Sequence, residues 1–282
     1  MGISIIENHE TVLTQTPIML VDSSYLTYNR FYASLKIFES KYNKKVLPED
    51  INDVVFLDIF TKNYFRSLKK MIKRFRINYM NVYLVRDCPR ANIWRMDEMP
   101  KYKKNRDNTT KYQSNKYNIG SIFKYVYSNI YPYLMNNYGV NVIKVEQAEA
   151  DDVIAVMSKM YNINELCNVI YIISEDKDMF QLLKYNKVKI YNMKFKRLGV
   201  GIDPEEFTNK KIILGDKSDN IGGLYIKDID TSVVNTDLIK IIDNNCLLSR
   251  NRKLIDFDYI PEEIVDRIYN TVCDLQFNYY LN

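Results

Sequence analysis

The chain has 282 residues and a mass of 33.5 kDa, long enough for two closely packed lobes. Its net charge of +5 comes from 40 Lys and Arg residues against 35 Asp and Glu residues. One histidine and four dispersed cysteines all but exclude a Ser-His-Asp triad or a histidine zinc site, and give no sign of a disulfide framework. Carboxylates must therefore carry any catalytic chemistry, with hydroxyls, Lys, Arg and bound metal.

The sequence contains neither a predicted membrane span nor a secretion signal. No segment reaches the roughly 18 consecutive apolar residues that a transmembrane helix needs. The first residues, MGISIIENHE, lack the basic start and the apolar stretch of a signal peptide. We therefore expect a cytoplasmic protein that is not secreted, inside the host cell if the source is viral, with no membrane partner.

Short apolar runs alternate with helical patterns along the chain. The runs have the length of buried strands, and in chain order they are residues 18–22, 80–87, 139–145, 169–174 and 188–193. Apolar side chains at helical spacing predict helices between and after these runs. In chain order they lie at about 26–41, 52–76, 119–137, from 149 onward, 205–214, 233–243 and 261–275.

This alternation predicts an α/β protein. Strands that alternate with helices form a mainly parallel sheet with helices on both faces. Beyond Pro204 the pattern is helical only. We therefore expect an N-terminal domain over residues 1–203 and a smaller C-terminal helical region over residues 204–282.

Two stretches of the chain are strongly basic. Residues 62–76 belong to the long predicted helix, whose polar face is a stripe of Lys and Arg that includes Lys69 and Lys73. Residues 101–116 belong to a polar segment at about 88–117 that has almost no apolar periodicity, which indicates a long loop or a weak helix. A basic surface around an acidic pocket suits an anionic polymer, although solvent alone also covers many Lys-rich helix faces.

Acidic residues follow the predicted strands. The first strand ends at Asp22, the second ends at Asp87, and the fourth leads into Asp176. Because the carboxyl ends of parallel strands meet at one edge of a sheet, we expect these side chains to lie close together. Further acids open the helix after strand three, follow Asp176 or begin a later element, and they are Glu149, Asp151, Asp152, Asp178, Asp216 and Asp219.

Each acid alone has another explanation, because Asp often caps a helix and acids stabilise a first helical turn. Together, so many carboxylates repel one another by roughly several kcal/mol unless cations neutralise them. Mg²⁺ prefers oxygen ligands, and two such ions roughly 3.5–4 Å apart promote phosphodiester hydrolysis. A phosphotransferase with a DxD motif is disfavoured by Ser24, and the glycine-rich loops of nucleotide-binding folds are absent from the sequence.

The order of the acidic motifs resembles that of the flap endonuclease/5′-3′ exonuclease family. Glu-Ala-Asp-Asp at 149–152, Ser-Glu-Asp-Lys-Asp at 174–178 and Gly-Asp-Lys-Ser-Asp-Asn at 215–220 occur in this order after Asp22 and Asp87. Bacteriophage members of the family are especially similar in the segment from Trp94 to Arg106 and in Leu-Ile-Asp-Phe-Asp-Tyr-Ile-Pro at 254–261. The resemblance covers about residues 17–275.

The resemblance implies a PIN-like nuclease domain that holds two Mg²⁺ ions, for which Mn²⁺ would substitute. The family motifs place one group of acids around the first ion, namely Asp22, Asp87, Glu149, Asp151 and Asp176. They place Asp178, Asp216 and Asp219 around the second ion, largely through water, and Asp152 beside both groups.

The basic segment at 88–117 would form an arch over the active site, through or under which a 5′ strand passes. By position, Lys103 and Arg106 would hold the scissile phosphate and stabilise its developing charge. Arg95, Tyr102 and Lys104 would add cationic and aromatic contacts to a single strand.

The family's helix–hairpin–helix, which grips duplex phosphates, is irregular in this chain. Gly222 and Gly223 are present, but the later Gly-x-Gly turn is missing. Since backbone amides approach a phosphate closely where glycines allow it, these two glycines are candidate nucleic-acid contacts. Lys69 and Lys73 would hold the template backbone by salt-sensitive contacts.

We therefore expect a metal-dependent 5′-3′ exonuclease or flap endonuclease that acts on DNA and RNA·DNA duplexes and removes RNA primers in phage or viral replication. The resemblance names a sliding clamp and a single-stranded-DNA-binding protein as candidate partners, and it implies a monomer. Two alternatives stay open, a PIN-like ribonuclease for single-stranded RNA and a non-catalytic structure-specific binding protein. The motif at 215–220 argues against the first alternative, and the intact set of acids argues against the second.

Overall fold

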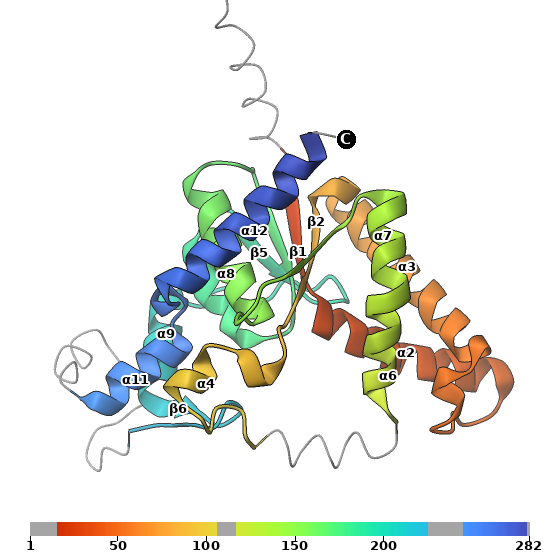
Figure 1. Cartoon of the computed structure of the whole chain (residues 1–282), viewed down its shortest axis with the longest axis horizontal. Helices are drawn as coiled ribbons and strands as arrows, with labels where there is room; N and C mark the ends of the chain where they lie inside the picture. The colour runs from red at the N-terminus through yellow and green to blue at the C-terminus, as the bar shows by residue number, and fades with distance from the viewer. Residues whose placement is uncertain (1–15, 106–116, 225–244, 281–282) are drawn as a thin grey trace, which may run out of the picture.

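A computed structural model describes residues 16–105, 117–224 and 245–280, the side chains of 276–280 excepted. The described chain is an α/β fold around a five-stranded parallel sheet (Figure 1). Its strands are β1 (Ile18–Asp22), β2 (Val82–Arg86), β3 (Asn141–Lys144), β4 (Ile170–Ile173) and β5 (Val188–Tyr191), in the spatial order β3-β2-β1-β4-β5. Each observed strand lies within the run predicted for it, and the predicted α/β class is confirmed.

Side chains from both faces of the sheet are buried, which explains why the central strands read as continuous apolar runs. In β1, Ile18 and Leu20 point into one hydrophobic cluster, whereas Met19 and Val21 point into another. All four are at most 3% exposed. A strand covered on both faces needs apolar residues at every position, and only Asp22, at its end, departs from this pattern.

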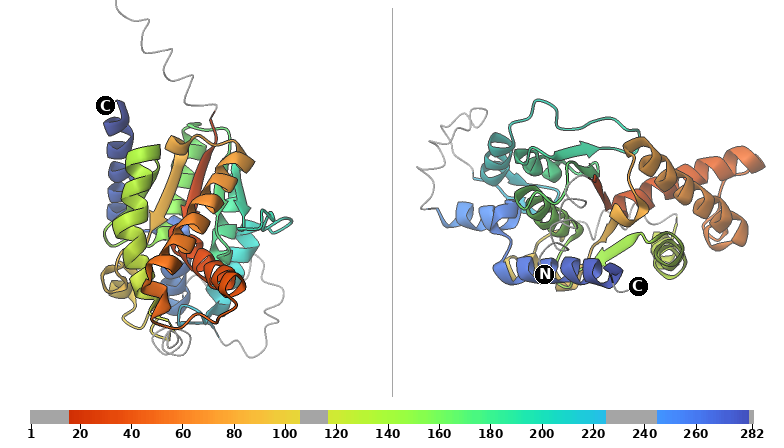
Figure 2. Two further views of the ribbon diagram at one scale, coloured as in Figure 1. Left: turned by 90° about the vertical axis from the view of Figure 1, so that its right-hand side faces the viewer. Right: turned by 90° about the horizontal axis from the view of Figure 1, so that it is seen from above.

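Two groups of helices cover the two faces (Figure 2). One face carries α2 (Ser23–Tyr42), α3 (Val54–Phe75), α6 (Ile119–Tyr125) and α7 (Tyr131–Tyr138), with a π-helical turn (Val126–Ile130) between α6 and α7. The other face carries α8 (Ala150–Ile163), the 3-10 helix η5 (Lys177–Lys184) and α12 (Glu262–Tyr280). None of the described helices contains a stretch long and apolar enough to cross a membrane.

A third, smaller cluster joins the segment after β2 to the C-terminal part of the chain. It packs Cys88, Ile93 and Met99 against Ile212 and Leu254. The elements that contribute are α4 (Arg95–Glu98), α9 (Pro204–Leu214), α11 (Cys246–Ile255) and the short hairpin of β6 (Gly215–Asp216) and β7 (Ile221–Gly222). The domain boundary at 203/204 stays a prediction.

Some expected elements lie outside the described residues. The helix predicted at 233–243 and the later part of the irregular hairpin belong to the range 225–244, and Arg106 belongs to the range 106–116. The remaining short elements are 3-10 turns, namely η1 (Asp50–Asn52), η2 (Tyr79–Asn81), η3 (Arg90–Asn92) and η6 (Phe257–Tyr259).

Gly223 allows a close approach between the chain after β7 and the end of α9. A Cβ atom on Gly223 would lie 2.0 Å from the carbonyl oxygen of Leu214, whereas a Cβ on Gly222 would meet no atom within 4 Å. The strand cannot shift freely, because the N–H of Leu224 donates to the Ile213 carbonyl at 2.8 Å.

We predict that Gly223→Ala lowers the free energy of unfolding by about 1–3 kcal/mol through overpacking. The neighbouring Gly222→Ala should stay within about 0.5 kcal/mol of the wild type, as open surface positions usually do. Urea unfolding followed by circular dichroism measures both values. Equal stability of the two variants would show that the close approach does not constrain the fold.

Candidate metal centre and active site

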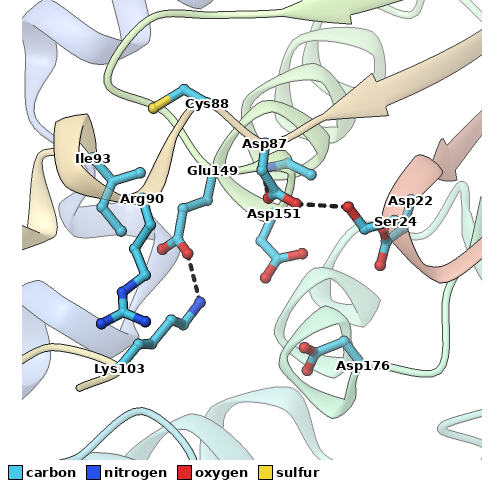
Figure 3. A pocket seen from close by; sticks show the side chains of 11 residues that line it. Asp22, Ser24, Asp87, Cys88, Arg90, Ile93, Lys103, Glu149, Asp151 and Asp176 are labelled. Carbon is cyan, nitrogen blue, oxygen red and sulfur yellow. Dashed lines mark hydrogen bonds and ion pairs between the residues drawn. The ribbon is translucent and has the colours of Figure 1, made fainter. Parts of the chain in front are cut away.

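The acids that follow the strands meet at the carboxyl edge of the sheet. The strand order reverses at β1, with β2 and β3 on one side and β4 and β5 on the other. Open α/β sheets bind ligands outside the carboxyl ends of their strands at such a switch point. A cavity of about 260 Å³ opens there (Figure 3) and is lined by Asp22, Ser24, Asp87, Cys88, Arg90, Ile93, Lys103, Glu149, Ala150, Asp151 and Asp176.

Asp22 serves both as a helix cap and as a wall of the cavity. One of its carboxylate oxygens accepts a hydrogen bond from the Tyr25 N–H at 3.0 Å, which caps α2, and the other accepts one from the Ser174 hydroxyl at 3.2 Å. Burial raises the pKa of Asp22 to about 6, and the nearby Asp87 and Asp176 add to this rise. The capping explanation and the site explanation therefore apply to the same side chain.

Asp87 and Asp151 are held beside Asp22 by α2 and α8. Asp87 accepts hydrogen bonds from the Ser24 hydroxyl at 2.8 Å and from the Ala150 N–H at 2.9 Å. Asp151, in the first turn of α8, has its pKa raised well above its usual range by burial and by the charges of Asp176 and Asp22. The cavity thus contains crowded carboxylates whose ionised forms are disfavoured in the protein alone.

Lys103 faces these acids from the segment that precedes residues 106–116. Its ammonium lies 2.5 Å from Glu149 Oε1 and 3.7 Å from Asp219 Oδ2, and its side chain is 10% exposed. Its backbone has a φ of 53°, a left-handed conformation that costs a non-glycine residue about 1–3 kcal/mol. This strained turn is held by the Lys103 N–H, which donates to the Asp219 carbonyl at 2.9 Å.

A second group of acids lies next to the first. Asp178, Asp216 and Asp219 have carboxylate oxygens within 4.8 Å of one another, close enough to share one metal ion. The ammonium of Lys211, from α9, contacts Asp178 and lies 2.6 Å from Asp216 Oδ2. Burial raises the pKa of Asp178 to about 6 even though Lys211 acts in the opposite direction. Hydrogen bonds from Lys211 and Ser218 outweigh burial at Asp216 and lower the pKa of that carboxyl.

Three residues expected in the cavity or on the nucleic-acid surface lie instead in a buried network. Arg95 is 3% exposed, and its guanidinium donates to both carboxylate oxygens of Asp152 at 2.8 Å and to Glu149 at 3.1 Å. Asp152 also accepts hydrogen bonds from the Trp94 indole and the Glu149 N–H, both at 3.0 Å. Both carboxylate oxygens of Asp152 therefore already accept hydrogen bonds from protein donors. One of these bonds belongs to the capping box that Asp152 and Glu149 form at the start of α8.

Tyr102 belongs to the same network. Its hydroxyl, in a side chain that is 2% exposed, contacts Glu149 Oε2 at 3.0 Å and Asp219 Oδ2 at 2.9 Å. Both side chains are thus buried in the structure, and the direct strand contacts expected of Arg95 and Tyr102 stay a prediction. Their positions link the first group of acids to the second.

The last turn of α11 is tied to Arg95 and to η5. The Leu254 carbonyl accepts a hydrogen bond from Arg95 Nε at 2.9 Å, and the Ile255 carbonyl accepts one from Gln181 Nε2 at 3.0 Å. Carbonyls at a helix C-terminus lack partners within the helix, so these two side chains satisfy them. The similarity noted at 254–261 therefore begins where the C-terminal region meets the site.

The remaining predicted residues lie on the surface. Lys69 and Lys73 are exposed on α3, Lys104 is exposed beside Lys103, and Gly222 and Gly223 are exposed next to the second group of acids. Three residues of the site were not predicted from the sequence. Ser24 and Arg90 line the cavity, and Lys211 contacts the second group of acids. The only local signal for Lys211 is its place one turn before the Gly-Asp motif that begins at Gly215.

Comparisons with known proteins agree with this architecture. Residues 17–212 match the family model described as 5′-3′ exonuclease, N-terminal resolvase-like domain. The chain is 28% identical over 242 residues to the ribonuclease H of Enterobacteria phage T4, covering 72% of this chain and 73% of the relative. It is 30% identical over 227 residues to a 5′-3′ exonuclease of Buchnera aphidicola subsp. Schizaphis graminum, covering 77% and 68% of the two chains.

Solved structures share the fold. A crystal structure of a bacteriophage T5 protein, co-crystallised with metal ions, matches with a TM-score of 0.63 at 19% identity and covers 92% of this chain and 99% of the other. The T5 flap endonuclease in a complex with DNA and metal ions matches with a TM-score of 0.60 at 21% identity and covers 92% and 98%. The predicted resemblance is confirmed. The family model matches more than half of the length of this chain. The chain therefore belongs to the 5′-3′ exonuclease family, whose members are nucleases.

Proposed function

We propose that the chain is a metal-dependent 5′-3′ exonuclease or flap endonuclease that hydrolyses phosphodiesters at the 5′ ends or flaps of DNA and RNA·DNA duplexes. The observation that carries this proposal is the acidic cavity at the switch point of the sheet, lined by Asp22, Asp87, Glu149, Asp151 and Asp176. The T5 flap endonuclease complex with DNA and metal ions supports the same substrate class.

The residues present fit two hard divalent cations. Their donor atoms are carboxylate oxygens, which Mg²⁺ prefers and Mn²⁺ also accepts. The raised pKa values of Asp22 and Asp178, both about 6, mark positions where a cation would relieve unfavourable charge. We propose that the five acids of the cavity hold the first ion and that Asp178, Asp216 and Asp219 hold the second. Related T5 structures contain divalent metal ions, zinc in one case.

The bound ions would supply a nucleophilic water and charge stabilisation at the leaving oxygen. The chain's own groups position the ligands and the phosphate. Ser24 and Ser174 orient Asp87 and Asp22, and Arg95 orients Glu149 from behind. Lys103 would donate to the scissile phosphate as negative charge develops there, and Arg106 would assist it.

Exposed cations supply a surface for the rest of the substrate. Lys69 and Lys73 on α3 would hold the template backbone. The end of α3 lies beside a further basic stretch, residues 194–197, because Phe75 packs against Phe195. Lys104, Gly222 and Gly223 would contact nucleic acid closer to the acids.

The finer assignments belong to the same proposal. Removal of RNA primers during phage or viral replication fits a 5′ nuclease that accepts RNA·DNA, and a T4 relative bears the name ribonuclease H. A monomer that meets a sliding clamp and a single-stranded-DNA-binding protein is the proposed working form. Substrates with a 5′ flap, with a 5′ RNA primer and with single-stranded RNA alone separate this function from a single-strand ribonuclease. Binding that persists in EDTA without any product would favour the non-catalytic alternative.

We predict that Asp176→Asn abolishes Mg²⁺-dependent release of short 5′ products while DNA affinity is retained. The substitution removes a ligand charge from the cavity but leaves the basic surfaces unchanged. Asp266→Asn, an exposed position on α12, is the matched control and should cleave like the wild type. Cleavage assays and fluorescence anisotropy on a 5′-flap duplex measure the two properties. Lost binding with normal turnover per complex would contradict the assignment.

Lys103→Ala should lower single-turnover cleavage by roughly 10²-fold or more, the usual cost of removing a group that stabilises developing charge. Affinity for the duplex should change far less, since Lys103 points into the cavity. Lys104→Ala, at the exposed neighbouring position, should instead weaken duplex affinity more than it lowers the cleavage rate. An unchanged rate in Lys103→Ala would remove this residue from the catalytic set.

Without divalent metal, stability should fall as the pH rises from about 4 through about 6. Asp22 and Asp178 have a pKa of about 6 in the folded chain against an ordinary value of 3.8, so the folded state binds more protons in this window and loses stability as they leave. Thermal unfolding in EDTA across this pH range measures the effect, and Mg²⁺ should restore the melting temperature above pH 7. Asp22→Asn should flatten the slope, whereas a slope unchanged in that variant would contradict the assignment.

A further inference from the structure

The ammonium of Lys211 lies where the second ion would bind. Lys211 belongs to α9, and its side chain contacts Asp178 and lies 2.6 Å from Asp216 Oδ2. These two acids and Asp219 are the trio whose oxygens lie within 4.8 Å of one another. The same small cavity is lined by Lys211 and by all three acids. The side chains of Lys211, Asp178 and Asp216 are only 19%, 19% and 11% exposed.

We propose that Lys211 is a built-in counter-cation of the second metal site, which neutralises the trio before metal arrives and must withdraw when the ion binds. The inference rests on the proposed function for the existence of that site. An ammonium in contact with two carboxylates of the trio takes the place that an ion needs, because Mg²⁺ binds oxygen ligands at about 2.0–2.1 Å. Two cations in one trio would also repel each other.

The first cavity lacks an equivalent competitor at three of its acids. Within the described ranges, Asp22, Asp87 and Asp151 form no ion pair with Lys or Arg, and Asp22 and Asp87 accept hydrogen bonds from serine hydroxyls and backbone N–H groups. Lys103 pairs with Glu149 and Asp219 instead. An ion can therefore bind these three carboxylates of the first cavity without breaking an ion pair at any of them.

This difference predicts ordered loading. The first site binds its ion tightly, and the second site binds weakly because part of the binding free energy is spent on expelling Lys211. The lysine stem has four flexible carbons, so its ammonium can leave the trio without movement of α9. Mutation of Lys211 should thus strengthen metal binding, whereas a lysine that merely supported the ligands would weaken it when removed.

The test compares Lys211→Met, which keeps the length of the stem and removes the charge, with Lys210→Met, an exposed position on the same helix. Mn²⁺ binding without nucleic acid is followed by calorimetry and by electron paramagnetic resonance of free Mn²⁺. The wild type and Lys210→Met should bind a second Mn²⁺ weakly, and Lys211→Met should bind it about tenfold or more tightly, which corresponds to about 1.4 kcal/mol or more. Lys211→Arg, which keeps the charge, should retain the weak second site.

Thermal unfolding provides the second readout. Lys211→Met should melt at a lower temperature than the wild type in EDTA, and saturating Mn²⁺ should raise its melting temperature by more than it raises that of the wild type. If Lys211→Met folds only with metal, refolding across a Mn²⁺ series gives the same comparison. An unchanged or weaker second site in Lys211→Met would overturn the proposal. Because these readouts contain no substrate, a failure of nuclease activity in parallel assays would count against the proposed function alone.

Discussion

Mutual repulsion among carboxylates at one edge of the sheet is the constraint on which the other features of the site depend. The parallel topology forces Asp22, Asp87 and Asp176 to the same edge, because each lies at or just beyond the carboxyl end of its strand. The protein relieves part of the repulsion with hydroxyls, backbone N–H groups and two ammonium groups. The repulsion that remains is seen in the raised pKa of Asp22 and Asp151, and it favours the binding of cations.

The two ammonium groups come from different parts of the chain, and each is held in a distinct way. Lys103 sits on a strained left-handed turn that its own N–H fixes to Asp219, whereas Lys211 projects from a regular helix. A strained turn is maintained by its surroundings and holds its side chain in one place. The flexible stem of a lysine on a helix lets its ammonium move while the backbone stays in place. The fixed position of Lys103 is consistent with its proposed role at the phosphate, and the mobile stem of Lys211 is consistent with the proposed withdrawal from the second site.

The strands and the acids were predictable from the sequence, because both depend on local patterns. Apolar runs identify buried parallel strands, and an acid at the end of such a run has a fixed direction in space. The fates of Arg95, Tyr102 and Asp152 were not predictable in this way. Their polarity indicated contacts with metal or with nucleic acid, but in the fold Arg95 pairs with Asp152, and the Tyr102 hydroxyl contacts Glu149 and Asp219. Lys211 was missed because its partners are up to 33 residues away in the chain.

The hydrogen bonds of Arg95 and Gln181 to the last turn of α11 have a consequence for how this fold can be recombined with its relatives. The N-terminal region is not independent of the C-terminal region, since two of its buried side chains donate to carbonyls of α11. In a chimera joined near residue 203, the buried Nε of Arg95 would lose its acceptor unless the helix of the new C-terminal region ended at the same place. An exchange that removes this acceptor would change the support that Arg95 gives to Glu149, even when every acid is kept.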